Sequence, residues 1–256
     1  MMQDMGVEKI MKINFKKNKD FIYSLSKIKK DEFILYHHLG LGDFVVCNGM
    51  VNYLSSQFNK IHIPVVSDPY FKMVKHLYSE NKNVNVFKIK NDNRESDIME
   101  FAFAAELPTL KVGFENVKKQ PFNEAFYNQL KLPYNISFSH FNLPKSSKEK
   151  KLTEHLIKYY KVDESSFKLI HCSSHDGRYD LKNLEDENNI FVDKDSDLFK
   201  NIFFYRDVID KAKEIHCINS VFVHLVERLK STKSLYFHNV RYSKMTLTKD
   251  WKIVPY

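Results

Sequence analysis

The sequence predicts an α/β protein in which parallel sheets are covered by helices and divided between two consecutive domains. Short apolar runs typical of strands alternate with longer segments of helical periodicity. With 43% hydrophobic residues, the 256-residue chain can bury one large core or two small ones. A polar stretch at 142–151 that contains a proline separates two regions with the same alternation. These three observations together predict the fold class.

The first predicted domain, residues 1–150, opens with a strand-like run, a glycine-rich turn and a helix. Strands are expected at 33–38, 60–66, 84–89 and 109–114, and helices at 44–58, 69–78, 97–106 and 123–130. Because strand and helix follow one another in this order, the strands are expected to run parallel.

The second predicted domain, residues 151–256, repeats the pattern after the polar stretch, which is interpreted as a linker. Strands are expected at 167–172, 189–192, 214–218 and 234–237, and helices at 205–212 and 221–229. The clearest unit is the last, in which strand 214–218 leads through an Asn-Ser turn into helix 221–229.

The charge of the chain favours anionic ligands without choosing among them. Forty basic and 32 acidic residues give a formal net charge of +8, which suits sugar nucleotides, nucleic acids and membrane surfaces alike. The basic residues are scattered or stand in short runs, and no nucleic-acid-binding signature accompanies them, so no nucleic-acid partner is expected. No apolar run approaches the ~20 residues that a membrane helix needs. At most a peripheral membrane contact and a cytoplasmic location are expected.

The three cysteines predict neither disulfides nor a metal site. Cys47, Cys172 and Cys217 lie far apart in apolar surroundings, and their number is odd. No CxxC pair occurs. Free thiols in a reducing compartment are therefore expected.

The glycine-rich turn 40–43 is the first candidate site. Three of the six glycines, Gly40, Gly42 and Gly49, fall within ten residues, which predicts a backbone with unusual torsions. Backbone N–H groups at such a turn can approach an anion at the positive end of the next helix. The pattern lacks the third glycine of a dinucleotide site and the Gly-Lys-Ser/Thr of a P-loop. The alternative is a tight turn in which Asp43 is the N-cap of the helix.

The second candidate site is the turn at Asn219 and Ser220. A hydroxyl and free amides stand at the helix start, and His224 follows one turn later on the same face, which is the geometry of a phosphate site. The alternative is an N-cap residue followed by a core histidine.

Residues 171–178 carry polar side chains at the end of a predicted strand. A Ser/His/Asp nucleophile set and a zinc site are both rejected, because residues this close in sequence diverge in direction and four convergent ligands are missing. The loop is instead expected to face the cleft between the domains. The phosphate contacts expected from it are Ser173, Ser174 and Arg178. The alternative for Arg178 is a surface ion pair with Asp176 or Asp180.

Two adjacent histidines precede the glycine turn. Strand alternation puts His37 and His38 on opposite faces, so that one packs inward and the other faces the cleft. His38 is interpreted as the cleft residue and as a second candidate for a catalytic base.

Three segments, 39–49, 121–127 and 214–225, resemble in their order the landmarks of bacterial GT-B glycosyltransferases that are distantly similar to the heptosyltransferases of glycosyltransferase family 9. The resemblance implies a GT-B fold, in which two Rossmann-like domains face a central cleft. It implies that Asp43, expected to be ionised at neutral pH, is the base of the acceptor side. It also implies that Asn219, Ser220 and His224 embrace the donor diphosphate.

The activity implied by the resemblance is transfer of a sugar from a nucleotide-sugar donor to a hydroxyl of a glycan or glycolipid acceptor, in polysaccharide biosynthesis. Inversion at the anomeric carbon is expected by the same analogy. Neither a cofactor nor a metal is expected, because helix amides and polar side chains can stabilise the leaving diphosphate. This agrees with the interpretation that the sequence lacks an Asp-x-Asp metal motif. The chain departs from the usual pattern of the family at two positions: Asn219 stands in place of an acidic residue, and Val221 stands in place of a glycine. A sugar-nucleotide epimerase of the same fold and a non-catalytic nucleotide-sugar or glycan-binding protein are the alternatives.

Overall fold

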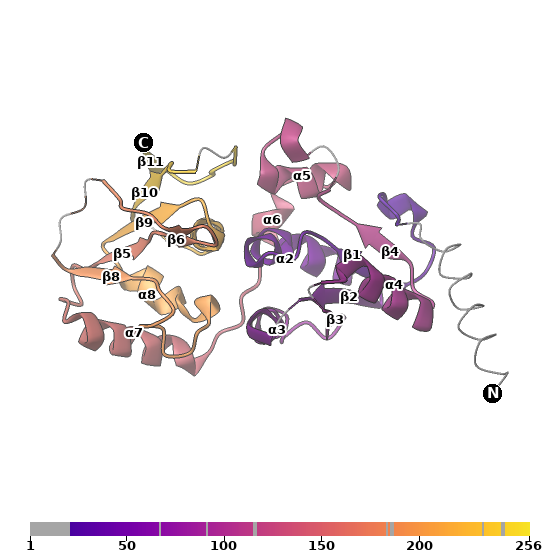
Figure 1. The fold of residues 1–256 in the computed structure, drawn as a ribbon, viewed down its shortest axis with the longest axis horizontal. Coiled ribbons are helices and arrows are strands. Elements are labelled where there is room, and N and C mark those ends of the chain that lie inside the picture. The colour runs from indigo at the N-terminus through magenta and orange to yellow at the C-terminus, as the bar shows by residue number, and fades with distance from the viewer. Residues whose placement is uncertain are drawn as a thin grey trace.

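Two parallel sheets, one from each half of the chain, form the framework in the computed structural model (Figure 1). The structure describes residues 21–66, 68–90, 92–114, 117–182, 184, 187–231, 233–241 and 244–256. The first 20 residues of the predicted first domain therefore lie outside the described part. We call residues 21–145 the N-terminal unit and residues 146–256 the C-terminal unit.

The sheet of the N-terminal unit has the strand order β3-β2-β1-β4, with all neighbours parallel. Its strands are β1 (Glu32–Tyr36), β2 (Lys60–Val65), β3 (Val84–Lys88) and β4 (Thr109–Lys111). The short helix η1 (Leu25–Lys27) precedes the strands. The helices that connect or follow them are α2 (Leu41–Ser55), α3 (Asp68–Leu77), α4 (Arg94–Ala104), η2 (Val117–Lys119), α5 (Phe122–Gln129) and α6 (Ile136–Ser139). The parallel arrangement agrees with the sequence prediction.

The sheet of the C-terminal unit has the order β11-β10-β9-β5-β8, and its neighbours are again parallel. Its strands are β5 (Lys168–His171), β8 (Asn189–Phe191), β9 (Glu214–Ile218), β10 (Ser234–His238) and β11 (Trp251–Val254). A small antiparallel hairpin pairs β6 (Ser173–Ser174) with β7 (Gly177–Arg178). The helices are α7 (Ser147–Tyr160), η3 (Ile202–Phe204), α8 (Arg206–Lys211) and α9 (Val221–Arg228). The sequence analysis did not predict β11.

The predicted linker 142–151 is only partly a linker. Its second half begins α7, because the Ser146 hydroxyl accepts a hydrogen bond from the N–H of Lys148 and Glu149 reaches back to the N–H of Ser146. The charged, polar composition had indicated a loop, but this capping box stabilises a helix start there. Such a cap contributes about 1 kcal/mol to the stability of the helix. The predicted division at residue 150 thus falls inside a helix, which packs against α8 and β8.

Two element boundaries differ from the prediction for local reasons. Helix α2 starts at Leu41, three residues early, so that the predicted turn is largely the first turn of the helix. Strand β4 ends at Lys111 because Gly113 has a positive φ of 89°. A Cβ atom at Gly113 would lie 2.2 Å from the Phe126 ring, so glycine is required there for space as well.

Helix α2 makes a central contact between the two units, beside the contacts of α3 with η3 and of Asn123 with Thr246. It is buried along nearly its whole length and packs against α6 and against α9 (Figure 1). Gly49 permits this packing, since a Cβ there would lie 2.4 Å from the carbonyl oxygen of Ile136. The Arg228 guanidinium, buried at the end of α9, donates to the Ser137 hydroxyl and the His224 carbonyl. The positions of the two helix starts are therefore fixed by a shared core.

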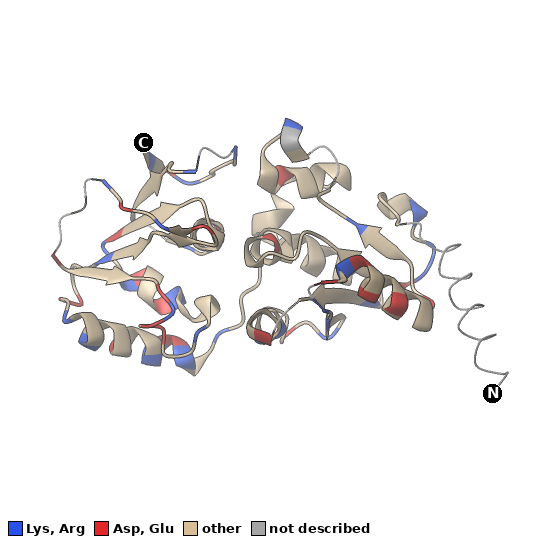
Figure 2. Cartoon of the chain, in the orientation of Figure 1, with Lys and Arg blue, Asp and Glu red and all other residues tan. Residues whose placement is uncertain are grey.

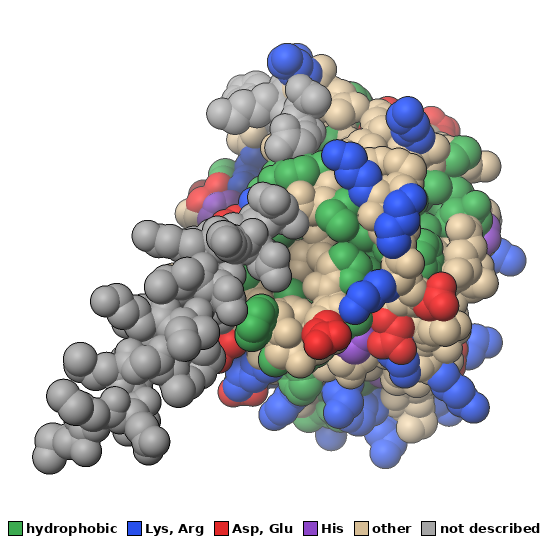
Figure 3. All heavy atoms as spheres, turned by 90° about the vertical axis from the view of Figure 1, so that its right-hand side faces the viewer, with side chains coloured by type: hydrophobic (Ala, Val, Ile, Leu, Met, Phe, Trp, Pro, Cys, Tyr) green, Lys and Arg blue, Asp and Glu red, His purple; other side chains and the backbone are tan. Residues whose placement is uncertain are grey.

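Charged residues of both signs are distributed over the described part of the chain. Figure 2 shows Lys and Arg spread over both units, with Asp and Glu among them. Figure 3 shows the outer end of the N-terminal unit, where basic side chains lie between hydrophobic ones. No helix in the described part of the chain combines the length and apolarity required to cross a membrane.

Candidate functional site

The first turn of α2 holds Asp43 by a hydrogen bond. Gly40 is the N-cap, with an extended backbone, and its N–H donates to Oδ2 of Asp43 at 2.9 Å. Asp43 is therefore the third residue of the helix and not its N-cap, which corrects the alternative drawn from the sequence. The carboxylate still satisfies an amide at the helix start, and its charge faces the positive end of the helix dipole.

The glycines of this turn serve close approach, not unusual torsions. Neither Gly40 nor Gly42 has a positive φ, and the left-handed residue is Leu39, with φ of 65°. A Cβ on Gly40 would lie 2.7 Å from Oδ2 of Asp43, so the missing side chain makes room for the carboxylate. A Cβ on Gly42 would lie 3.5 Å from Cδ2 of His224, which shows how near α2 and α9 come.

The Asp43 carboxyl has an unusual basicity. Its side chain is buried, with the residue only 7% exposed. Burial raises its pKa from 3.8 to about 7, against the opposing effect of the Gly40 N–H. The carboxyl is then close to half-ionised at neutral pH, whereas the sequence analysis expected it to be ionised. A group with this pKa can exchange a proton near pH 7.

The start of α9 carries neutral polar groups. Ser220 is the N-cap, and its hydroxyl accepts from the N–H of Phe222 at 3.3 Å. His224 is 4% exposed, and burial lowers its pKa to about 3, so its ring is neutral. Nδ1 of His224 is buried and has no hydrogen-bond partner among the described residues. Both readings of the sequence, the cap with a core histidine and the anion site, fit this geometry.

His171 was weighed from the sequence only within the rejected nucleophile set and zinc site, and its contact with the start of α9 was missed. Its Nδ1 lies 3.0 Å from the Ser220 hydroxyl, and its ring stacks on Phe222. Burial lowers its pKa to about 4, which makes it a neutral partner. His171 and Ser220 are 49 residues apart, and only the pairing of β5 with β9 brings them together. No sequence spacing could have revealed this contact.

Arg241 is a site residue that the sequence analysis missed. Its guanidinium Nη1 donates at 2.8 Å both to the Ser174 hydroxyl and to the Asn219 carbonyl oxygen. Its Nε lies 3.2 Å from the carboxylate of Asp176. One side chain, from the segment after β10, thus ties together the two loops that were predicted to hold phosphate.

Arg178 lies apart from this cluster. It is exposed at the end of β7, and its guanidinium stands over the Phe191 ring at 4.8 Å. It lines a hollow of about 170 Å³ together with Tyr179 and Phe191. An ion pair between Arg178 and Asp176 was one alternative from the sequence. In the structure Asp176 pairs with Arg241 instead. Ser173 precedes Ser174 in β6 and is half-buried.

The two histidines before the turn differ in burial. His37 is fully buried, and its Nδ1 accepts from the N–H of Leu39 at 3.2 Å. His38 is half-buried among the rings of Phe114, Phe122 and Phe126, with centroids 4.5 to 5.9 Å away. Burial lowers the pKa of His38, so its ring is neutral at pH 7. An aromatic cage of this kind favours a packing surface over a proton-transfer role.

Asp-x-Asp spacing, typical of metal-binding loops, does occur at 193–197, so the interpretation that the sequence lacks such a motif was wrong. In the structure these carboxylates bond their own loop. Asp193 accepts from the N–H groups of Asp195 and Ser196 and from the Tyr160 hydroxyl, and Asp197 accepts from the N–H groups of Phe199 and Asn201. Within the described residues, no three His, Cys, Asp or Glu side chains converge as metal ligands. The three cysteines are buried and unpaired.

The fold and the two helix starts define a parallel, Rossmann-like α/β protein with polar groups beyond the carboxyl ends of β1 and β9. The structure is similar to the crystal structure of the glycosyl transferase family 9 from Veillonella parvula DSM 2008, with a TM-score of 0.54 and 7% sequence identity over 88% of this chain and 86% of that chain. The chain therefore shares its fold with a glycosyltransferase. Its sequence matches no protein-family model and, at a significant level, no curated protein.

Proposed function

We propose that this protein is a glycosyltransferase of GT-B type that moves a sugar from a nucleotide-diphosphate donor to a hydroxyl of a glycan or glycolipid. In this proposal residues 1–150 form the acceptor side and residues 151–256 the donor side. The reaction proceeds with inversion, without a metal or cofactor, in the cytoplasm, and serves polysaccharide biosynthesis. The shared fold with a glycosyltransferase supports the class of reaction.

The observation that carries the proposal is the approach of the two helix starts. Gly42 brings the first turn of α2 against Val221 and His224 of α9. The helix turn that carries a carboxyl with a pKa near 7 thus lies against a helix start that carries a hydroxyl and a neutral imidazole. The first group suits proton removal, and the second suits a diphosphate.

The mechanism follows from this pairing as a single displacement. Asp43, in its ionised form, takes the proton of the acceptor hydroxyl, and the hydroxyl oxygen attacks the anomeric carbon while the nucleoside diphosphate leaves. The amides at the start of α9, together with Ser220 and His224, stabilise the charge that develops on the leaving oxygen. Asn219 and Arg241 hold the loop in place through the carbonyl contact at 2.8 Å. Ser173, Ser174 and Arg178 are proposed as outer contacts to the donor.

The test begins with donor binding and continues with products. Thermal-shift measurements of the full chain with UDP-, GDP-, ADP- and CMP-sugars should identify one nucleotide class that raises the melting temperature. Incubation of that donor with glycan acceptors should yield a lengthened glycan and free nucleotide. A sugar converted without acceptor would instead assign the epimerase. An intact donor after incubation with all acceptors would leave a binding protein. No stabilisation by any sugar nucleotide contradicts the glycosyltransferase, the epimerase and a nucleotide-sugar-binding protein, and leaves only a glycan-binding protein.

A further inference from the structure

A row of aromatic rings runs along the carboxyl edge of the N-terminal sheet and has no part in the proposed proton transfer. Starting at Tyr36, the last residue of β1, successive ring centroids lie 5.1 Å apart to Phe114, 4.5 Å to His38 and 5.9 Å to Phe122. Phe122 in turn lies 6.5 Å from the ring of His224 on α9. We call Tyr36, Phe114, His38 and Phe122 the aromatic row. It connects the start of the donor helix with the outer part of the sheet edge.

The middle of the aromatic row is open to solvent. Phe114 is 37% exposed and His38 and Phe122 are half-buried, whereas Tyr36 at the end of the row is only 4% exposed. Adjacent rings at the surface offer an apolar face on which a ligand can pack. The ring of Phe114 is also held from one side by the Lys111 ammonium, 4.4 Å from its centroid, so its position is fixed.

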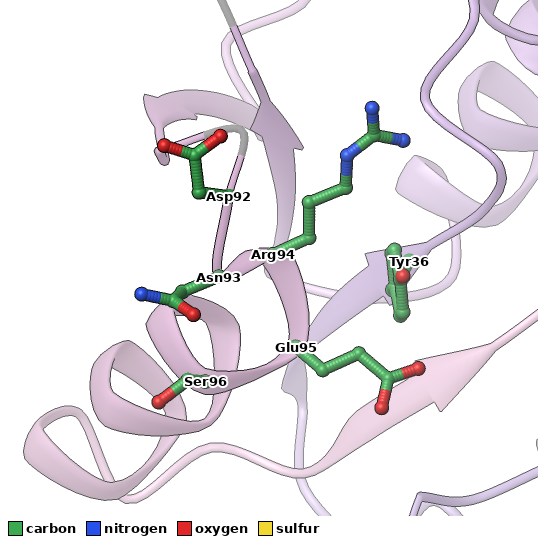
Figure 4. Close-up of a pocket in the computed structure, with 6 residues that line it drawn as sticks. All are labelled: Tyr36, Asp92, Asn93, Arg94, Glu95 and Ser96. Carbon is green, nitrogen blue, oxygen red and sulfur yellow. The ribbon is translucent and has the colours of Figure 1, made fainter.

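A polar hollow of about 410 Å³ lies at the outer end of the row (Figure 4). Besides Tyr36, its lining is Asp92, Asn93, Arg94, Glu95 and Ser96, at the start of α4. In Figure 4, Arg94, Glu95 and Tyr36 lie on one side of the helix start, and the other three lie on the opposite side. This volume falls within the range of small-molecule sites.

The charges of the hollow balance. Glu95 pairs with the Lys111 ammonium at 2.6 Å, and Asp92 is matched in number by Arg94. Carboxylate, amide, guanidinium and hydroxyl groups bind hydroxyl-rich ligands through several hydrogen bonds each. Without an excess of positive charge, the hollow offers nothing that favours a phosphate or a carboxylate over a neutral ligand.

From these observations we infer that the acceptor is a neutral oligosaccharide that lies across the aromatic row, with its outer units in the hollow at the start of α4. This inference rests on the proposed function, because the row leads from the hollow to the pair of helix starts. A pyranose ring has apolar C–H faces that pack on aromatic rings and hydroxyls at its rim that need polar partners. The row supplies the first kind of contact, and the hollow supplies the second. Because Tyr36 belongs to both, one sugar can touch the near end of each, but filling the hollow and the row as far as Phe122 takes two or more linked units.

The experiment is binding of the full-length chain to a glycan array that carries neutral and anionic glycans of one to several units. Wild-type protein should bind neutral glycans of two or more units and should bind single sugars at least tenfold more weakly, which corresponds to about 1.4 kcal/mol. Phe114→Ala should lower this binding by roughly tenfold. Phe114→Leu, which keeps apolar bulk but no ring, should lower it by a similar factor. Tyr159→Ala, at an exposed ring on α7, is the matched control and should bind as the wild type.

The results divide cleanly. Binding only to anionic glycans, binding to single sugars as strong as to longer chains, or unchanged binding by folded Phe114 variants would overturn the inference. Absence of any glycan binding would overturn it as well. Thermal shift with sugar nucleotides separates this failure from that of the proposed function: a donor that still stabilises the chain leaves the glycosyltransferase proposal standing, and its absence removes both.

Discussion

The first turn of α2 follows β1, the first strand of the N-terminal unit, and the first turn of α9 follows β9, a later strand of the C-terminal unit. The two turns differ in the residues that form and cap them. The α2 turn uses Gly40 and Gly42 to make room for a carboxyl that caps the helix from within. The α9 turn has no glycine and is capped by the Ser220 hydroxyl. The α2 turn therefore carries a carboxyl that titrates near pH 7, whereas the α9 turn carries a hydroxyl and an imidazole that stay neutral. The difference teaches that similar backbone positions can carry groups of different protonation behaviour, which in the proposed function serve proton transfer and anion binding.

The largest expected effect is the loss of the base in the α2 turn. Asp43→Asn keeps the size of the side chain and an oxygen that can accept from Gly40, so it removes proton transfer selectively. Turnover should fall by about 100- to 10,000-fold, the usual contribution of a general base. Turnover, donor affinity and melting temperature should be measured together. Turnover within a few-fold of wild type would make Asp43 a helix cap only and leave His38 as the next base to test.

The pH profile should show the same asymmetry between the turns. Because the pKa of Asp43 is raised to about 7, kcat/KM should rise about tenfold per pH unit below that value and level off above it. Stability should change in the opposite sense: the folded state binds a proton between pH 4 and 7 that the unfolded state has lost, so stability falls as pH rises. The loss relative to Asp43→Asn is up to about 4 kcal/mol, at about 1.4 kcal/mol per pKa unit.

The expected pH dependence of the rate is checked by kcat/KM profiles, and that of stability by chemical denaturation. Both are measured on wild type and Asp43→Asn from below pH 4 to above pH 7. The rising limb should vanish in Asp43→Asn if any activity remains. An identical limb in the variant would assign the titration to another group.

A smaller effect is expected at the α9 turn, where binding and not chemistry is at stake. The double change Ser220→Ala and His224→Ala should weaken donor binding by about 1 to 3 kcal/mol, as for lost hydrogen bonds to a charged group. Calorimetric titration with the stabilising sugar nucleotide measures this. Ser146→Ala is the matched control, because Ser146 caps α7 in the same unit in the same way. The control should lose about 1 kcal/mol of stability with donor affinity intact. Equal donor affinity in all three proteins would move the donor elsewhere.

The smallest effect should distinguish the two glycines of the α2 turn. In Gly40→Ala, the new methyl would stand 2.7 Å from Oδ2 of Asp43 and displace the carboxylate, whereas in Gly42→Ala it would make an ordinary contact at 3.5 Å with His224. Loss of one charged hydrogen bond corresponds to about 1.5 to 3 kcal/mol at most, so Gly40→Ala should lower turnover by roughly tenfold and Gly42→Ala less. Steady-state rates of the two variants decide this. A larger loss in Gly42→Ala would show that the contact of α2 with α9 matters more than the position of Asp43.

The parallel α/β class, most strands and most helices were predictable from the sequence because they depend on local periodicity. Apolar runs of strand length followed by helical patterns recur at β1 to α2 and at β9 to α9, and the observed bounds of β9 equal those predicted. Helix α7 was missed although its signal, Ser146 three residues before Glu149, is local. Its charged composition outweighed the capping box in our interpretation.

Tertiary structure decided the parts of the site that depend on distant pairs. The pKa of Asp43 follows from burial by surrounding elements, which no residue pattern near Asp43 encodes. His171 reaches Ser220 through the order of strands in the sheet, and Arg241 reaches Ser174 and Asn219 from a separate loop. The sequence by itself determined which polar residues stand at strand ends, since that is a property of neighbours along the chain. Which of them meet, and in which protonation state, was decided by the packing of α2 against α9, because proximity and desolvation are properties of the folded chain.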